Sequence, residues 1–393
     1  MHHLSTARAA LTLAVVGAGL LAIQAQTAQA GEFNVTNLVS DGSVPAATID
    51  PNLINPWGIS YAPTGPFWVS DNGTGLATIY TGTGSKVPLN VTIPPPAGQS
   101  FTSSPTGQVF NGSSTEFMVG GGGSTAAAAF LFDTEDGTIS GWAPSLSLSN
   151  AFLAVDNSAG GAGAVYKGLA IGSTGGSDFI YASNFRAGDV EMYNSSFGLV
   201  KTFTDPTVAA GYAPFNVTNL DGTLYVTFAL QDAAKHDDVA GAGNGYVDAF
   251  SLDGTFERRI VSMGGQVDSP WGLDIAPASF GSLAGDLLVG NFGDGTISAF
   301  DPTTGVFEGE LLGPGGVPIV EGDLWGLING NDASAGSSNE VYFTSGIQDE
   351  SEGLFGSISP VPEPGVWTLM IVGLGLMGAT LRGRRGVAAR ATT

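Results

Sequence analysis

Short apolar runs separated by turn residues recur along the chain and predict β-strands. The clearest copy lies between Ser269 and Phe307, where runs at 271–275, 286–291 and 296–300 alternate with turns rich in glycine, proline, serine and aspartate. A further run at 306–312 would supply a fourth strand. Such runs, without a helical period, are typical of antiparallel strands joined by hairpins. One four-stranded sheet leaves two edges and two apolar faces uncovered, so it needs similar sheets beside it.

The start of this unit, Pro270-Trp271-Gly272-Leu273, recurs along the sequence. It returns closely at 56–59 and 324–327 and more loosely at 105–108, 166–169 and 214–217. The residues at the position of Gly272 are spaced by 49, 61, 48, 56 and 54 residues, and they are Gly58, Gly107, Gly168, Asn216, Gly272 and Gly326. A repeat of about fifty residues with four strands in each copy is typical of a β-propeller, and six copies predict six blades.

Two copies depart from the regular unit. In the second copy we expect the second strand in EFMVGGGG from Glu116 and the third in AAFLF before Asp133. The sixth copy shows three strands, ending at Ile358, while an alternating segment at 32–40 precedes the first copy. We expect this segment to complete the last blade and close the ring, because a closed ring leaves no blade edge unpaired. A loose strand on the outer rim is the alternative.

Composition agrees with one large all-β domain. The 393 residues include 60 glycines and no cysteine, and only 12% are charged, which argues against a helical bundle and against disorder. Without cysteine the chain has no disulfide, no thiolate nucleophile and no zinc–sulfur site. Residues 31–360 hold 34 acidic and seven basic side chains, a difference of −27. This charge repels nucleic acids and anionic lipid headgroups, so neither is expected as a partner.

The N-terminal segment predicts export. Arg8 and two histidines precede an apolar run at 9–23, and Ala28-Gln29-Ala30 places small residues at a typical cleavage site. Residues 1–30 therefore predict a signal peptide cut after Ala30. An N-terminal membrane anchor is the alternative, although the run is short for one.

The C-terminal segment has three parts. Val361-Pro362-Glu363-Pro364 precedes an apolar run at 366–381, and Arg382, Arg384 and Arg385 follow. The prolines end the last strand, the apolar run predicts a single transmembrane helix, and the arginines favour the cytoplasmic side. We therefore divide the tail into a sorting signal with its helix at 361–386 and a basic cytoplasmic end at 387–393.

This tail resembles the PEP-CTERM sorting signal of Gram-negative bacteria. The resemblance implies recognition by an exosortase, a membrane-embedded cysteine protease, with removal of the tail. Delivery would be to the outer cell envelope or the extracellular matrix, after a transient stay in the inner membrane. A plain stop-transfer anchor is the alternative.

The repeat region also resembles a known group. The motifs at 55–58, 231–245 and 269–272 are similar to those of an uncharacterised six-bladed propeller family that often carries PEP-CTERM tails. The resemblance covers residues 33–359 and extends, more distantly, to NHL-type propellers. Neither group implies an established reaction.

Propeller topology predicts which residues share a face. Loops that lead into the innermost strand and loops between the second and third strands lie on one rim, because the chain of a blade runs up and down. The expected ligand-binding rim residues are Asn55, Trp57, Asp71, Asn72, Asn184, His236, Trp271, Asn291 and Asp294. Asn72, Asn184 and Asn291 are expected at matching positions in three blades, where they could bracket a central cation or ligand. Two alternatives remain open: the tryptophans, with Trp325, could pack between blades, and the asparagines could cap hairpins.

The loop at 231–244 is the longest on this rim and predicts a metal site. Asp232, Asp237 and Asp238, beside the carbonyl groups of a glycine-rich run, offer the oxygen ligands that calcium prefers. Their spacing is not that of an EF-hand. The alternative is a solvated loop in which Lys235 and His236 neutralise the aspartates.

Three classes of function remain. We favour a non-catalytic surface or matrix protein whose rim binds a glycan, a protein or a small molecule. The alternative is a calcium-dependent, lactonase-like hydrolase that uses the channel, with Asp71 or Asp232 as the base. A third class is a periplasmic partner in signalling or assembly, held by the tail. Catalysis through a Ser-His-Asp site is disfavoured, because His236 is the one histidine after residue 30 and no Gly-x-Ser-x-Gly motif is present.

Overall fold

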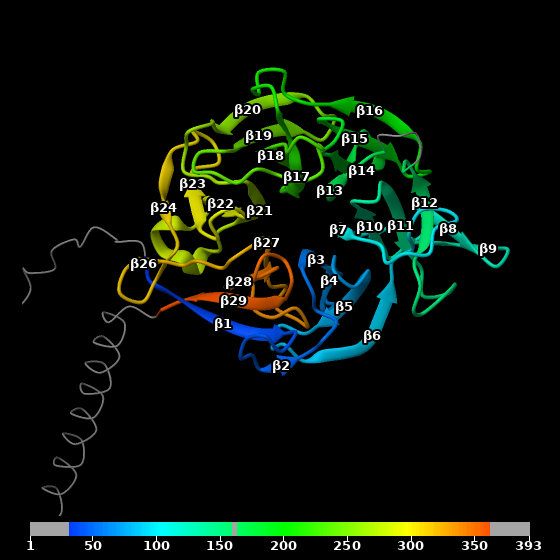
Figure 1. Cartoon of the computed structure of the whole chain (residues 1–393), viewed down its shortest axis with the longest axis horizontal. Coiled ribbons are helices and arrows are strands. Elements are labelled where there is room, and N and C mark those ends of the chain that lie inside the picture. Colours follow the sequence, from blue (N-terminus) through cyan, green and yellow to red (C-terminus); the bar gives the residue numbers. More distant parts are fainter. Residues whose placement is uncertain (1–30, 159–162, 362–393) are drawn as a thin grey trace, which may run out of the picture.

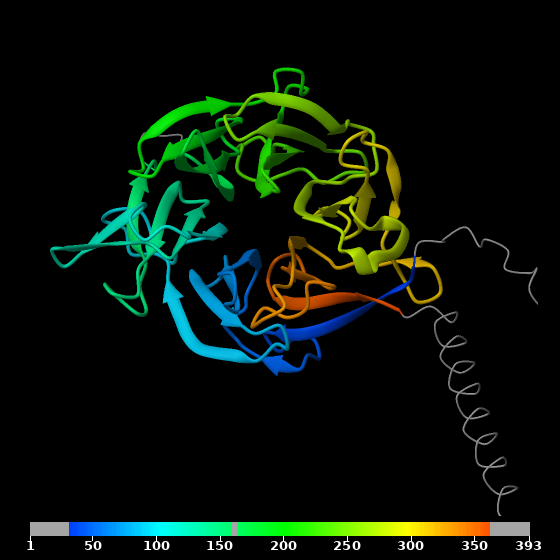
Figure 2. The same ribbon diagram turned by 180° about the vertical axis from the view of Figure 1, so that it is seen from behind.

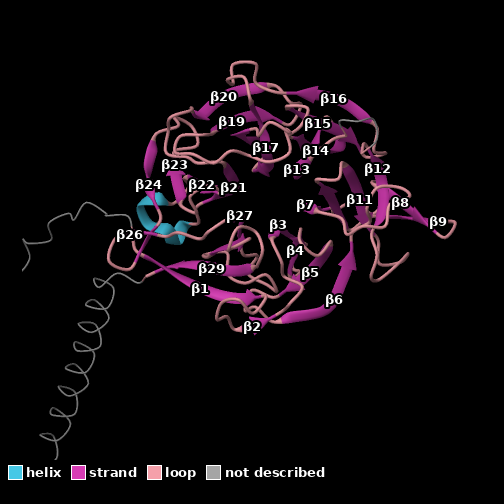
Figure 3. Cartoon of the chain, in the orientation of Figure 1, coloured by secondary structure: helices cyan, strands magenta, loops and turns pink. Residues whose placement is uncertain are grey.

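Six four-stranded antiparallel sheets surround a common axis in the computed structural model, which describes residues 31–158 and 163–361. Figure 1 shows the blades following one another around the ring in sequence order, with the first strand of each blade nearest the centre. Apart from the short 3-10 helix η1 (Ala278–Leu283), the described residues form strands and loops, as Figure 3 shows. The predicted all-β, six-bladed propeller is therefore confirmed.

The blades are numbered here in chain order, and each is given from its inner to its outer strand. Blade 1 contains β3 (Pro56–Tyr61), β4 (Phe67–Asp71), β5 (Leu76–Tyr80) and β6 (Lys86–Thr92). Blade 2 contains β7 (Pro105–Phe110), β10 (Phe130–Thr134), β11 (Thr138–Trp142) and β12 (Phe152–Asp156). Blade 3 contains β13 (Tyr166–Thr174), β14 (Ser177–Asn184), β15 (Asp189–Asn194) and β16 (Leu199–Phe203).

The remaining blades follow the same plan. Blade 4 contains β17 (Tyr212–Leu220), β18 (Thr223–Leu230), β19 (Tyr246–Ser251) and β20 (Phe256–Val261). Blade 5 contains β21 (Pro270–Ile275), β22 (Leu287–Asn291), β23 (Ile297–Phe300) and β24 (Phe307–Glu310), and the small hairpin β25 (Leu312–Gly313) and β26 (Val317–Pro318) follows it. Blade 6 contains β27 (Leu324–Asn329), β28 (Val341–Ser345), β29 (Leu354–Pro360) and β1 (Phe33–Ser40), with the short β2 (Thr48–Ile49) at its outer edge.

The first strand of the described chain closes the ring. β1 pairs with β29 in antiparallel register from Phe33 opposite Pro360 to Ser40 opposite Leu354. Seen from both sides in Figures 1 and 2, β1 lies beside β29 in the last blade. The predicted closure is confirmed, and the alternative of a loose strand on the rim is wrong. Pairing supplies the backbone partners that β29 would otherwise lack at its outer edge.

Blade 2 differs from the prediction. EFMVGGGG does not supply its second strand, because β8 (Met118–Gly121) pairs with β9 (Ser124–Ala127) in a separate two-stranded hairpin. Gly122 and Gly123 form the turn with φ of 61° and 83°, the left-handed conformation that a two-residue hairpin turn requires. The second strand is β10, which is the segment assigned to the third. The inserted hairpin accounts for the longest step between markers, 61 residues.

Hydrophobic cores lie between neighbouring blades. In the core between blades 1 and 2, for example, Trp68 and Ile79 pack against Phe130, Phe132 and Trp142. The Trp68 ring stacks on the Phe130 ring, with centroids 4.1 Å apart. Each sheet is thus covered on both faces by its neighbours, which is what a closed ring provides.

Several predictions fall on residues that the structure does not describe. The signal peptide with Ala28 and Ala30, the sorting residues Pro362, Glu363, Pro364, Arg382, Arg384 and Arg385, and the transmembrane helix all lie there. Within residues 31–158 and 163–361, we find no helix with the length and hydropathy that crossing a membrane requires.

Candidate functional site

Six aromatic side chains meet on the axis of the ring. They form the axial aromatic cluster, whose members are Trp57, Phe185, Phe215, Trp271, Phe292 and Trp325. The Trp57 and Trp325 rings stack with centroids 3.4 Å apart, and Trp271 meets them edge-on at 6.1 and 5.7 Å. Trp57 belongs to blade 1 and Trp271 to blade 5, and side chains of blades that are not neighbours can meet only near the axis. The tryptophans are almost fully buried, and Trp57 and Trp271 each pack on Trp325 of the neighbouring blade 6, as the packing alternative expects. The contact between Trp57 and Trp271 across the axis was not expected.

Two of the three indole N–H groups of this cluster hold the starts of inner strands, whereas that of Trp57 is buried without a hydrogen-bond partner. Trp325 Nε1 donates to Asn55 Oδ1 at 2.9 Å, and Trp271 Nε1 donates to the carbonyl oxygen of Lys167 at 2.8 Å. Asn55 has φ of 46°, which is unusual for a residue other than glycine. Its amide nitrogen also donates to Glu350 Oε2 at 2.7 Å. Asn55, expected to meet a ligand, therefore holds the rim together.

Lys167 stands where three other blades have tryptophan, and its ammonium group enters the axial aromatic cluster. Only 2% of its side chain is exposed. The nitrogen forms an ion pair with Glu135 and another, at 3.3 Å, with Asp237. It also lies 5.1 Å from the centre of the Trp57 ring, within cation–π range. Burial alone would lower the pKa of Lys167, but the two carboxylates outweigh burial and raise it above its ordinary value. The ammonium group therefore stays charged.

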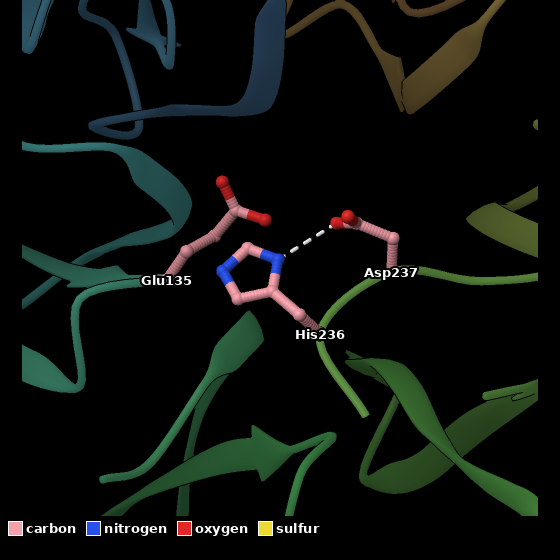
Figure 4. A group of neighbouring side chains, drawn as sticks. All are labelled: Glu135, His236 and Asp237. Atoms are coloured by element: carbon pink, nitrogen blue, oxygen red, sulfur yellow. Dashed lines mark hydrogen bonds and ion pairs between the residues drawn. The ribbon is translucent and has the colours of Figure 1, made fainter. Parts of the chain in front are cut away.

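Glu135, His236 and Asp237 lie close together (Figure 4), and Glu135 and Asp237 pair with this lysine. Glu135 comes from the turn between β10 and β11, and the other two come from the long loop between β18 and β19. His236 Nδ1 donates to Asp237 Oδ1 at 2.8 Å. One potential ligand atom from each of the three lies within 4.8 Å of the others, the separation expected of metal ligands. The hydrogen bond between His236 and Asp237 raises the pKa of His236, and it lowers the pKa of Asp237 to about 2.

The predicted calcium ligands occupy three different environments. Asp232 Oδ1 accepts hydrogen bonds from the backbone nitrogens of His236 and Asp237, so this side chain shapes its own loop. Asp237 faces Lys167 and His236. Asp238 is largely buried, and burial raises its pKa. Among the described residues these three carboxylates do not form a group with metal-ligand spacing, whereas Glu135, His236 and Asp237 do.

The strand register shows that Asp71, and not Asn72, holds the position equivalent to Asn184 and Asn291. Asp71 lies opposite Pro56, the position that Asn184 holds opposite Tyr166 and Asn291 holds opposite Pro270. The expected match of Asn72 with the other two asparagines is therefore wrong by one residue, and one residue reverses the side of a strand. Asp71 is fully buried, and burial raises its pKa well above the ordinary value. Asn72 instead donates to Glu135 Oε2 at 2.9 Å in the next blade.

The remaining asparagines have local roles. Asn184 donates to Glu191 Oε1 at 2.7 Å and accepts from the backbone of Ala187 in the same hairpin. Asn291 donates to Thr296 Oγ1 at 3.0 Å across its turn. Both bond within their own hairpins, as the capping alternative expects. Asp294 is exposed in the same turn and accepts from the backbone nitrogen of Thr296.

Three residues at the centre of the site were missed by sequence reasoning. Lys167, Glu135 and Glu350 were not predicted. Lys167 links blades 2, 3 and 4 through Glu135 and Asp237, and Glu350 links blade 6 to Asn55 at the start of blade 1. A signal for Lys167 was present, since Tyr166-Lys167-Gly168 aligns with Pro-Trp-Gly in a chain with only 12 basic residues. Glu135 and Glu350 lie in turns of irregular length, where the repeat gives no alignment.

Comparison with known sequences identifies the tail and the relatives of the chain. The family model described as the PEP-CTERM protein-sorting motif matches residues 360–385. The uncharacterized protein R648 of Acanthamoeba polyphaga mimivirus is 32% identical over 333 residues, which cover 83% of this chain and 80% of the viral protein. This chain belongs to the same protein family as R648. A second mimivirus member, the uncharacterized protein L690, is 31% identical and covers 83% of this chain and 85% of its own.

The sorting motif marks this member of the family as a substrate for exosortase processing. It points to an exported protein associated with the cell envelope. The predicted resemblance to the PEP-CTERM signal is thereby confirmed.

Solved structures with a similar fold are distant. Virginiamycin B lyase from Staphylococcus aureus has a TM-score of 0.49 and 13% identity, covering 84% of this chain and all of the lyase chain. A gluconolactonase from Xanthomonas campestris has a TM-score of 0.46 and 12% identity, covering 79% and 87%. At these values the likeness concerns the propeller fold and carries nothing about activity.

Buried carboxyl groups predict that the propeller is more stable in mild acid than in mild base. Burial raises the pKa of Asp133, Asp274, Glu321 and Glu350 to about 7. A carboxyl group with a raised folded-state pKa stabilises the fold below its unfolded pKa, and that contribution disappears as pH rises through the folded value. We expect the melting temperature to be at least ~5 °C higher at pH 5.5 than at pH 8.0.

The measurement is a series of thermal melts in ~0.3 M salt, which screens repulsion between exposed carboxylates. Asp274→Asn should reduce the difference in melting temperature between pH 5.5 and pH 8.0. Glu308→Gln, which changes an exposed residue in the same blade, should leave this difference unchanged. Groups with lowered pKa values, such as Asp237 at about 2, lose their contribution only at lower pH. A melting temperature that rises steadily from pH 5.5 to pH 8.0 would contradict the prediction.

Proposed function

We propose that the protein is an exosortase-sorted surface or matrix protein whose propeller is a non-catalytic binding module. The rim around Lys167 is its recognition face. The observation that carries this proposal is the pairing of the Lys167 ammonium group with Glu135 and Asp237 above the axial aromatic cluster. Lysine and carboxylates satisfy one another, so the site offers a fixed surface and no free nucleophile.

The chemistry of the rim favours a neutral or amine-bearing polysaccharide of the matrix. The Asp237 side chain is 68% exposed and His236 is 38% exposed, while Gln348 and Asp349 lie exposed on the loop between β28 and β29. Carboxylates can accept hydrogen bonds from sugar hydroxyl groups, and amides can both accept hydrogen bonds from them and donate to them. The excess of carboxylates would repel an anionic polymer, and it would attract one that carries ammonium groups.

The experiment measures binding of the purified protein to immobilised chitosan, to dextran and to alginate. We expect retention on chitosan and weaker retention on dextran, with none on alginate. Asp237→Asn should weaken chitosan binding by roughly tenfold, because the exposed carboxylate is lost. Asp221→Asn is the matched control, since Asp221 lies exposed with φ of 52° on the turn between β17 and β18, at the opposite end of the blade. Equal binding of the two variants, or preference for alginate, would contradict the proposal.

A metal-assisted hydrolase is the second candidate, favoured by the spacing of Glu135, His236 and Asp237. A metal ion bound there would lie beside the Lys167 ammonium group, and repulsion between the two cations would weaken metal binding. A histidine ligand also suits zinc better than calcium. A rise in melting temperature with calcium or zinc that Asp237→Asn abolishes, together with turnover of a lactone or ester, would support this candidate over the binding module.

A further inference from the structure

A second site lies on the axis, at the end opposite Lys167. It is a cavity of about 440 Å³ lined by the inner strands of all six blades. Its inner end reaches Trp271 of the axial aromatic cluster. At the other end, Tyr61, Phe110, Leu220 and Asn329 are half-buried at the C-terminal ends of their strands. The cavity therefore opens to solvent on the face away from the proposed recognition rim.

The amide side chains that line the cavity donate hydrogen bonds to backbone carbonyl groups. Gln108 Nε2 donates to the carbonyl oxygens of Gly58 and Trp68 in blade 1, at 2.7 and 2.6 Å. The amide nitrogens of Asn216, Asn219 and Asn329 each donate, at 2.8 Å, to a backbone carbonyl oxygen of a neighbouring blade. These bonds tie the inner strands together. Gln108 Oε1 and Asn329 Oδ1 are left buried without a partner, so the lining has acceptor atoms to spare.

Asp274 adds a carboxyl group without a counterion. Its side chain lines the cavity with only 7% of its surface exposed. One carboxyl oxygen accepts from the backbone nitrogen of Ile275 at 2.8 Å, and the other is buried without a partner. No lysine, arginine or histidine is among the residues that line the cavity. A buried carboxylate is costly unless a cation pairs with it, and here the chain itself supplies none.

This lining limits the class of ligand. An anion would find no positive side chain and would face Asp274. A single metal ion is far too small for a volume that is typical of organic-ligand pockets. Spare acceptors, one carboxyl group, and the aromatic rings of Tyr61, Phe110 and Trp271 match a ligand with an ammonium group and an apolar body. We propose that the cavity binds a small organic amine whose ammonium group pairs with Asp274.

The test uses the full-length protein and three probes of one size: hexylamine, 1-hexanol and hexanoate. Calorimetry should give a Kd for hexylamine below ~1 mM, with 1-hexanol at least ~10-fold weaker and hexanoate not bound. Affinity for hexylamine should increase from pH 5.5 to pH 8.0, because burial raises the pKa of Asp274 to about 7 and the carboxylate is needed for pairing. The amine itself stays protonated over this range, so the pH dependence reports on the protein.

Variants separate the cavity from the acidic exterior. Asp274→Asn should weaken hexylamine binding at least ~10-fold and leave 1-hexanol binding unchanged. Glu308→Gln, which removes the same charge from the surface of blade 5, and Asp237→Asn on the opposite rim should bind hexylamine as the parent protein does. If Asp274→Asn fails to fold, the probe series and the pH profile of the parent protein still decide. Equal affinity for hexylamine and 1-hexanol, binding of hexanoate but not hexylamine, or an Asp274→Asn variant with parental affinity would overturn the proposal.

Discussion

Lys167→Met should lower the free energy of unfolding by about 4 kcal/mol, which is the usual cost of removing one partner from a buried ion pair. The methionine keeps most of the apolar stem of Lys167 but leaves Glu135, with 12% of its side chain exposed, without its cation. The cation–π contact with Trp57 is lost as well. Denaturant unfolding of the two proteins measures the difference.

Two further variants show whether the loss comes from the unpaired carboxylate. Lys201→Met is the matched control: Lys201 is exposed and donates to the carbonyl oxygen of Asp253 at 2.7 Å, so its loss should change stability by less than ~1 kcal/mol. Glu135→Gln added to Lys167→Met should recover part of the loss, because a neutral amide tolerates burial better than a carboxylate. If Lys167→Met matches Lys201→Met, the buried pair does not hold the rim together.

Gly107→Ala should destabilise the ring by roughly 3 kcal/mol or more, through overpacking against rigid backbone. Gly107 lies on β7, the inner strand of blade 2, and a Cβ atom there would overlap the backbone nitrogen of Leu169 on β13 of blade 3. Backbone on a paired inner strand cannot move aside as a flexible side chain can. Thermal and denaturant unfolding should both show the loss.

Gly112→Ala in the same blade is the control for the loss of glycine itself. Gly112 is exposed, and the nearest atom to an added Cβ is 3.8 Å away, on the Phe110 ring. This variant should be as stable as the parent protein or slightly more so. A Gly107→Ala protein with parental stability would show that the inner strands have room to separate, which the structure does not provide.

Most of the fold could be predicted because the repeat provides its own alignment. In the reference copy, the predicted runs at 271–275, 286–291 and 296–300 match β21, β22 and β23 to within one residue at each end. The closing role of 32–40 followed from a missing fourth strand in the last blade. The prediction failed in blade 2, where the segment EFMVGGGG joined a hairpin of its own through the turn at Gly122 and Gly123. A local strand pattern indicates a strand but does not say which sheet the strand joins.

The site was less predictable for a physical reason. Topology placed Trp57, Trp271 and the 231–244 loop at the same end of the ring, but it could not say that the tryptophans meet on the axis. The full burial of Asp71 and the partial burial of Asn72 depend on a register of one residue. Lys167 was passed over because its significance comes from partners 32 and 70 residues away, Glu135 and Asp237. Contacts between blades of this kind leave no local pattern.

Because β1 pairs with β29, the propeller can complete its fold only at the end of translocation across the membrane. During export with the N-terminus leading, β1 emerges first and must wait, its edge unsatisfied, until five blades and part of the sixth have followed. The closing strand β1 thus crosses the membrane before its partner strand β29. Because β29 lies immediately before the sorting tail, the ring can close only when nearly the whole chain has crossed. Any chaperone that shields the leading strand in transit should therefore be needed most by chains stalled late in translocation.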